Sequence, residues 1–367
     1  MIINSFKGIT NTQPIRSMPD NALSDAVNVD ITDSGSVIVR NGYAHTKTFN
    51  VSSVHSTQAG DCFVISDTTS LCRIDNNLNL LYLIDSTATS FCDYGDLFFT
   101  NDGIMVKGSD AIDLKLLRPP FYPPDISSGA NPESPPGIYS AMQTISDRFG
   151  GLESGTSPVV SIEMDGSGGI TGSSTYPYPT IYYSNATGTG YFTDEGTQLQ
   201  PWLIGAEGFP ENVSQVEFFD GSLYCSVDNG EGSSALIWSL PFLYHLFNYS
   251  NNFAIIPGSI LSMCKVNAGL LIGTDSAIFI FDGQYLTRFV NYGVIQGTSM
   301  VKLPDGEALV YTKRGICKTG EPFQNMTENT VSLPLGSICH ASLVYQNGIK
   351  KLIVLNDGDG EAFNKSF

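Results

Sequence analysis

The sequence is poor in charged residues, and basic residues are especially scarce. Only 15% of the 367 residues are charged, and 36 Asp and Glu residues outnumber 18 Lys and Arg residues, which gives a formal net charge of −18. Typical soluble domains contain about 25% charged residues. No run of Lys and Arg is longer than a pair, so the sequence lacks the basic stripe with which proteins bind nucleic-acid phosphates. The uncharged surface predicts either faces covered by partners or an ordinary β-protein rich in Ser, Thr and Asn.

Long apolar runs are also missing. No segment approaches the roughly 18 apolar residues of a membrane-spanning helix. The first residues, Met1–Arg16, lack the basic and apolar regions of a signal peptide. We therefore expect neither membrane insertion nor export by the standard secretory route.

The cysteines do not form a recognisable framework. There are seven, without a C-x-x-C motif, which argues against a zinc site and against a complete set of disulfides. Most lie within apolar stretches such as DCFVIS and LYCSV, so we predict free thiols that are buried as small apolar side chains. This usage is typical of synthesis in a reducing cytoplasm.

Motifs for catalysis and cofactor binding are absent from the sequence. The four His residues show no metal-binding spacing, and H-E-x-x-H, G-x-x-x-x-G-K-[ST], G-x-G-x-x-G and G-x-S-x-G do not occur. We therefore predict no enzymatic activity, no catalytic residue, no metal and no cofactor.

What the sequence does contain is one pattern that recurs along it. A short lead-in precedes an apolar run, a turn rich in Ser, Thr, Asp and Asn, and a second apolar run. This pattern predicts a β-hairpin. Such hairpins can bury their apolar faces when they stack radially as the blades of a β-propeller. The five copies begin at Gly60, Gly95, Gly221, Ala268 and Glu307.

The repeats occupy two stretches that flank a segment of different composition. A Pro-rich run from Arg118 to Gly137 ends the first stretch, and Gly- and Ser-rich hairpins follow it. The sequence predicts an all-β fold, a β-propeller of about five blades with an inserted small β-sandwich. The predicted parts are an N-terminal segment with a closing strand (1–50), the propeller's first part (51–136), the insertion (137–208), the propeller's second part (209–356) and a flexible tail (357–367).

Three short motifs resemble tail proteins of bacteriophages. The N-terminal segment is similar to the start of virion proteins with a tail β-propeller, through Ala26, Asn28, Asp30, Gly35, Arg40 and Gly42. The hairpin tip of the insertion resembles the fibronectin type III-like modules of phage tails, through Gly151, Glu153, Ser154 and Ser157. A later stretch resembles the last blades of the same propellers, through Gly273, Thr274, Ile278, Phe279, Thr312, Gly315 and Ile316.

The resemblance implies a structural virion protein of the tail, of the nozzle or hub type of short-tailed phages. Such a protein would be made in the host cytoplasm and form part of a homo-oligomeric ring around the DNA exit channel. Genomic DNA would pass through without specific binding. The expected partners are other tail proteins, on the adaptor or portal side and in a fibre or needle. The interaction candidates in the projecting hairpin are Arg148, Glu153, Ser154 and Ser157.

The alternative is a carbohydrate-binding propeller or a glycan depolymerase used in host recognition. A glycosidase needs two carboxylates close together, usually near aromatic residues that bind sugar. Tyr is plentiful, with 17 residues, but only two Trp residues occur. Four aspartates could converge at the mouth of a propeller: Asp93, Asp220, Asp275 and Asp282.

Overall fold

The computed structural model describes residues 29–31, 37–39, 48–57, 59–67, 69–129, 134–147, 151–184, 190–320, 322–327, 338–346, 349–356 and 363–366. The regular elements in these ranges are β-strands and two short 3-10 helices, η2 (Leu114–Leu117) and η3 (Pro201–Leu203). The predicted all-β class is therefore confirmed. No helix in the described part of the chain is long and apolar enough to cross a membrane.

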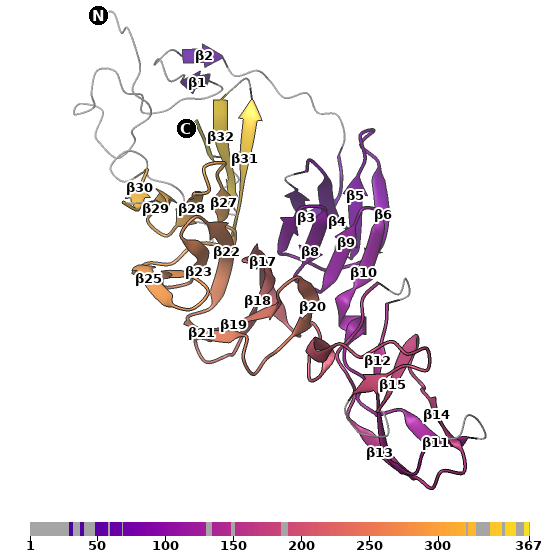
Figure 1. The fold of residues 1–367 in the computed structure, drawn as a ribbon. Helices are drawn as coiled ribbons and strands as arrows, with labels where there is room; N and C mark the ends of the chain where they lie inside the picture. Colours follow the sequence, from indigo (N-terminus) through magenta and orange to yellow (C-terminus); the bar gives the residue numbers. More distant parts are fainter. Residues whose placement is uncertain are drawn as a thin grey trace, which may run out of the picture.

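Six sheets follow one another along an arc and form the blades of the propeller (Figure 1). Blade 1 contains β3 (Val51–Ser56), β4 (Cys62–Ser66), β5 (Ser70–Ile74) and β6 (Leu80–Asp85). Blade 2 contains β7 (Phe91–Tyr94), β8 (Leu97–Thr100), β9 (Ile104–Lys107) and β10 (Asp110–Asp113). Blade 3 contains β17 (Val213–Phe219), β18 (Ser222–Asp228), β19 (Ser233–Leu240), β20 (Leu243–Phe247) and β21 (Phe253–Pro257).

The last three blades complete the arc. Blade 4 contains β22 (Ile260–Val266), β23 (Gly269–Thr274), β24 (Ile278–Phe281) and β25 (Leu286–Val290). Blade 5 contains β27 (Met300–Lys302), β28 (Ala308–Thr312), β29 (Gly315–Lys318) and β30 (Gln324–Asn325). Blade 6 contains β26 (Gln296–Thr298), β31 (Ile338–Gln346), β32 (Ile349–Asn356) and β33 (Phe363–Ser366), and β26 runs parallel to β31.

The recurrent sequence pattern has one structural meaning. Its five copies are the hairpins between the second and third strands of blades 1 to 5: β4–β5, β8–β9, β18–β19, β23–β24 and β28–β29. Blade 6 does not carry the pattern. The predicted number of about five blades follows from a usual blade length of about 40–45 residues, and the structure describes six sheets because blades such as blade 2, which spans 91–113, are shorter.

One predicted feature of the chain ends differs from the structure. In the N-terminal segment, β1 (Val29–Ile31) and β2 (Val37–Val39) pair with each other as a hairpin, and among the described strands β26 pairs with β31 in blade 6. Most of residues 1–50 lie outside the described residues, so the closing strand stays a prediction. The predicted flexible tail contains β33, which extends blade 6 by pairing antiparallel with β32. Backbone pairing along a sheet edge explains this strand, since the polar sequence around it gives no periodic signal. The other N-terminal residues of the resemblance lie outside the described residues.

Each pair of neighbouring blades shares an apolar core. Phe63 and Phe98 stack between blades 1 and 2, with ring centroids 4.2 Å apart, and Phe99 and Phe218 belong to the core between blades 2 and 3. Three further cores join blades 3 and 4, blades 4 and 5, and blades 5 and 6. Burying one Leu or Phe side chain contributes about 1.5–3 kcal/mol. The sheets therefore stabilise one another in sequence along the arc.

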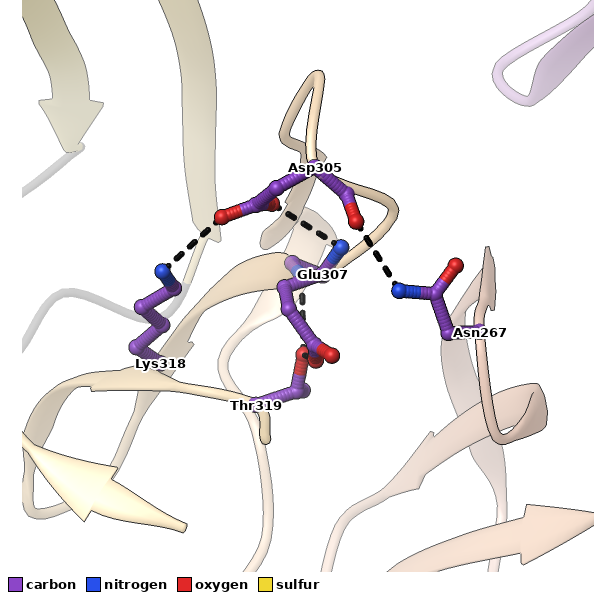
Figure 2. Close-up of polar contacts among 6 residues, drawn as sticks. Asn267, Asp305, Glu307, Lys318 and Thr319 are labelled. Atoms are coloured by element: carbon purple, nitrogen blue, oxygen red, sulfur yellow. Dashed lines mark hydrogen bonds and ion pairs between the residues drawn. The ribbon is translucent and has the colours of Figure 1, made fainter. Parts of the chain in front are cut away.

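Turns add polar contacts between neighbouring blades (Figure 2). Asn267, in the turn between β22 and β23, donates from Nδ2 to the backbone oxygen of Asp305 at 2.9 Å and from its backbone N–H to Gly306 at 2.8 Å. Gly306 has a φ of +82°, and a Cβ there would lie 2.0 Å from Asn267 Oδ1. Lys318 Nζ lies 3.0 Å from Asp305 Oδ2, and this hydrogen bond holds the pKa of Asp305 below its ordinary value. The contact requires a glycine in the blade 5 turn.

The insertion is a small two-sheet module, formed by β11 to β16, that projects from the arc of blades (Figure 1). One sheet has the order β13 (Val160–Met164), β12 (Gly137–Ile145), β15 (Pro179–Ser184), β16 (Tyr191–Phe192). The other pairs β11 (Asp125–Gly129) with β14 (Gly169–Ser173). The inserted β-sandwich is thus present, but it begins at β11 instead of residue 137, because β11 completes the second sheet.

The module and blade 3 share one core. Met142 and Tyr182 of the module pack with Leu246 of β20, which is fully buried, and Leu240 and Leu243 of blade 3 cover the same cluster. The backbones also meet, since Glu207 and Phe247 exchange hydrogen bonds of 2.8 Å in both directions. A separately folding insertion would leave Leu246 exposed, so module and blade belong to one cooperative unit.

Substituting Leu246→Ala tests this shared core. The cavity left behind should lower the free energy of unfolding by about 2–5 kcal/mol and shift a single transition for the whole chain. Ile204→Ala is the matched control, because Ile204 lies in the same region but is 56% exposed and should change stability by less than about 0.5 kcal/mol. Calorimetry that shows two separate transitions would contradict the shared unit.

The seven cysteines are free thiols, and all except Cys62 are buried. Burial raises the pKa of the Cys92, Cys225 and Cys264 thiols, because the thiolate would lose its hydration. The prediction that most cysteines are small buried side chains is confirmed.

Thiol labelling should follow this order of burial. In the native protein, Cys62 should react with a thiol reagent first, and the other six should react only when the chain unfolds. Mass spectrometry of partly labelled protein identifies the modified residue, and Cys62→Ser is the control that should remove the early phase. Early labelling of Cys225 or Cys264 would contradict the packing between the blades.

Candidate functional site

Three of the four interaction candidates predicted from sequence, Glu153, Ser154 and Ser157, form hydrogen bonds within the module. Ser154 and Ser157 are buried, and their hydroxyls accept hydrogen bonds from the backbone N–H groups of Ile145 and Gln143 at 2.9 and 3.0 Å. Their role as exposed contact residues is therefore wrong, because segment 151–157 runs beside β12 and supplies hydrogen-bond partners to it. Arg148 lies outside the described residues.

Glu153 is half-buried and faces inward. Its carboxylate accepts hydrogen bonds from the hydroxyls of Thr144 and Tyr182, the latter at 2.7 Å, and its backbone oxygen lies 3.0 Å from His245 Nε2 on β20. Burial and the hydrogen bond to Glu153 raise the pKa of Tyr182. Burial lowers the pKa of His245, because the charged imidazole would lose its hydration. Glu153 thus joins the module to blade 3 and is not available as an exposed contact.

The four aspartates considered for a propeller mouth do not share one end. Successive turns of an antiparallel meander lie at opposite ends of a blade. Asp275 lies in the β23–β24 turn and Asp282 in the following turn, where backbone N–H groups of Tyr285 and Gln284 hold its pKa below the ordinary value. Asp220 lies in the β17–β18 turn of blade 3. Among the four, Asp93 alone lies within a strand, on β7.

Asp93 belongs to a row of titratable side chains on the first strands of five successive blades. We call this row the inner row, and each member lies close to the C-terminal end of its strand: His55 of β3, Asp93 of β7, Glu217 of β17, Lys265 of β22 and Lys302 of β27. These first strands pack against one another from β7 to β17, from β17 to β22 and from β22 to β27. The propeller arrangement thus places in one row residues that are up to 247 positions apart in the sequence, with His55 at one end and Lys302 at the other.

The inner row carries charges of both signs. His55 Nε2 lies 2.9 Å from Asp93 Oδ1, and the His55 ring packs beside Phe91 and Phe98. Burial, with a smaller contribution from the nearby Asp93 carboxylate, raises the pKa of Glu217 to about 7. The hydrogen bond from Phe218 N–H and the charges of Lys302 and Lys265 oppose this shift. Glu217 therefore takes up or releases a proton near neutral pH.

This geometry can exchange protons and bind charged groups of either sign. Among the described residues, no group of three or more His, Cys, Asp and Glu side chains could hold a metal ion. Sequence reasoning missed four of the five members, although a signal exists. A single charged or His residue precedes the first turn of each blade between less polar neighbours, as in CDY, VEF, CKV and VKL.

A second feature is exposed apolar surface on the module and the segment that leads to it. The exposed side chains there are Phe121, Tyr122, Ile138, Val159, Tyr178, Trp202 and Ile204. Phe121 and Tyr122 are 77% and 64% exposed, and their rings meet edge to face with centroids 4.9 Å apart. Contiguous exposed apolar groups in soluble proteins mark interaction sites.

The Phe121–Tyr122 pair is held in a rigid loop. Two prolines precede it and two follow it, in the sequence PPFYPP. The hydroxyl of Tyr176 accepts hydrogen bonds from the backbone N–H groups of Phe121 and Tyr122 at 3.1 and 3.3 Å. The buried Gln143 donates from Nε2 to the backbone oxygen of Tyr122 at 2.8 Å. The module thus presents two aromatic rings on a backbone that is fixed in advance.

Comparison with known proteins does not place the chain in a family. No family model and no curated protein match it. Among solved structures, the extracellular domain of a hybrid two-component system from B. thetaiotaomicron is similar with a TM-score of 0.31 and 12% identity, over 84% of this chain and 37% of that one. YCF48 bound to a D1 peptide gives a TM-score of 0.21 and 12% identity, over 74% and 91%. The chain thus spans little more than a third of the first structure.

The raised pKa of Glu217 predicts a pH dependence of stability. The folded state binds the Glu217 proton more tightly than the unfolded state, so stability should fall as pH rises from the ordinary value of 4.5 to about 7. Glu217→Gln removes this loss. The variant should unfold roughly 2–4 °C above the wild type at about pH 8, with a smaller difference at about pH 5.

The matched control for this measurement is Glu163→Gln, at an exposed residue of β13. Thermal unfolding of wild type and both variants across this pH range gives the comparison. A Glu217→Gln difference that stays constant with pH, or that also occurs in Glu163→Gln, would show that Glu217 does not titrate near neutrality.

Proposed function

We propose that this chain is a structural subunit of a phage tail, of the nozzle or hub type that its sequence resembles, and that the module docks a neighbouring tail protein. The observation that carries the proposal is the Phe121–Tyr122 pair. Exposed aromatic rings on a fixed backbone are the groups that dominate protein interfaces, because little conformational entropy is lost when they are buried by a partner.

The attachment of the module supports a mechanical role. Its core is continuous with blade 3 through Leu246 and Tyr182, so a load applied to the module passes directly into the propeller. A docking element on a flexible linker would not transmit force or fix orientation. A tail subunit needs both properties, because neighbouring subunits must keep their register during DNA ejection.

The composition supports the same proposal. The net charge of −18 and the scarcity of Lys and Arg disfavour binding of DNA phosphates, as expected of a protein beside which DNA has to slide. The low content of charged residues, 15%, leaves large neutral faces that subunits of a closed assembly can cover.

Complementation of a phage that lacks this gene tests the proposal. The wild-type chain should be incorporated into purified particles and restore infection. Phe121→Ala/Tyr122→Ala should reduce the amount of chain in the particles at least about tenfold, because both rings are removed from the interface. Quantitative mass spectrometry of density-purified particles measures this amount.

Tyr285→Ala is the matched control, since Tyr285 is 70% exposed but lies next to the β24–β25 turn of blade 4. This variant should be incorporated like the wild type. Absence of the wild-type chain from particles would reject the tail function. Normal incorporation of the double variant would reject the docking role of Phe121 and Tyr122 alone.

A further inference from the structure

A cavity of about 460 Å³ lies where the module meets blades 2 and 3. Its lining is mainly apolar and includes Leu97, Met105, Ile112, Leu152 and Leu243. Gln200, Trp202 and Leu203 of the module, Lys107 and Asp110 of blade 2 and Phe242 of blade 3 also line it. Its volume falls within the range of about 300–1,000 Å³ that is typical of small-ligand sites. Because three structural units contribute to it, the cavity exists only when the module is docked on the arc.

Two exposed aromatic side chains from different units border the cavity. Trp202 lies on η3, which begins with Pro201, and remains 50% exposed. Phe242, in the β19–β20 turn, remains 69% exposed. Its backbone adopts a φ of +61°, a region that aromatic residues rarely occupy, and its N–H donates to the oxygen of Gly221 at 2.8 Å. An exposed apolar ring held in an unfavourable conformation points to a functional constraint.

Polar side chains line the cavity together with the apolar ones. Lys107 and Asp110 are directly opposite each other on β9 and β10, and both are exposed, as is Gln200. An ammonium, a carboxylate and an amide can each form hydrogen bonds with hydroxyl groups of a ligand. Because all three side chains are exposed, they can bind ligand hydroxyls at the edge of the cavity while the apolar lining contacts the faces of the ligand.

The two carboxylates deeper in the cavity are already engaged. Asp147 accepts hydrogen bonds from the backbone N–H groups of Gly151 and Leu152 at 3.2 and 2.9 Å. Glu153 accepts from Thr144 and Tyr182. Neither is placed as a free acid or base, whereas a glycosidase requires two carboxylates that act on the scissile bond. The chemistry of the cavity is that of binding without cleavage.

We propose that this cavity binds a short oligosaccharide. Trp202 and Phe242 would pack against the apolar C–H faces of sugar rings, while Lys107, Asp110 and Gln200 would bind their hydroxyls. The combination of flat aromatic groups and surrounding polar groups matches a ligand whose rings have apolar faces and polar edges. This site is independent of the proposed docking role of Phe121 and Tyr122, because none of its residues belongs to that pair.

Fluorescence of Trp202 tests the proposal directly. Trp238 is the second Trp of the chain and stacks on Tyr224 within blade 3, so Trp238→Phe leaves Trp202 as the sole reporter. The probes are maltotriose, cellotriose, mannotriose and triacetylchitotriose, each at up to about 10 mM, which detects millimolar affinity. At least one trisaccharide should shift the emission of Trp202 and protect it from quenching by acrylamide.

Saturation-transfer NMR with the same trisaccharides then locates the site in the otherwise wild-type chain. Trp202→Ala and Phe242→Ala should each weaken binding at least about tenfold. Ile204→Ala should bind like the wild type, since Ile204 is 56% exposed beside η3 but does not line the cavity. If Phe242→Ala fails to fold, Trp202→Ala still tests the site, provided that its thermal unfolding is the same as that of the wild type.

Three outcomes would overturn the proposal. The first is that none of the four trisaccharides changes the fluorescence of Trp202. The second is that a trisaccharide still binds after both aromatic substitutions. The third is that the fluorescence of Trp202 responds to N-acetylphenylalaninamide but to no sugar. The last result would assign the cavity to an apolar side chain of a partner protein. Any of these results leaves the particle-incorporation experiment, and with it the proposed tail function, unaffected.

Discussion

The structure depends on the covering of each blade's apolar face by the next blade. A four-stranded sheet with one apolar face is not stable alone in water, and here five successive cores join six sheets. The same covering fixes where polar groups can lie. On the first strands, residues such as Cys92 and Cys264 enter the cores, and their neighbours Asp93 and Lys265 are left for the inner row. The inner row is therefore a consequence of blade stacking.

The module is also stabilised by covering an apolar surface of a neighbouring blade. Residues of the module bury Leu246 of β20, and His245 hydrogen-bonds to the backbone of Glu153. The module is therefore not an independent domain on a Pro-rich linker. The linker consequently holds Phe121 and Tyr122 in place instead of allowing the module to move. Both the proposed docking surface and the proposed sugar site depend on this attachment, since one needs a fixed backbone and the other needs two surfaces held together.

The sequence predicts individual hairpins better than it predicts the contacts between strands that are far apart along the chain. Hairpins such as β18–β19 follow from apolar runs around turns, and burial of thiols such as Cys225 follows from apolar neighbours. Blade 6 could not be predicted in this way, because its parallel strand β26 is only three residues long and ends at Thr298, far before β31 begins at Ile338. Ser154 and Ser157 look like polar surface in the sequence, and only the position of β12 shows that they are internal hydrogen-bond partners.

The ends of the arc follow from the same constraint that stabilises its middle. Blade 1 packs one face on blade 2, and along its other face the register places Val54 beside Val64 and Cys72 beside Tyr82. Val54 and Tyr82 are 57% and 60% exposed. At the other end, Ile338 of blade 6 is 42% exposed. An exposed apolar group at each end of a stack is stabilised when another surface covers it, so these residues support the proposed role in an assembly, in which the order of the blades continues into contacts between subunits.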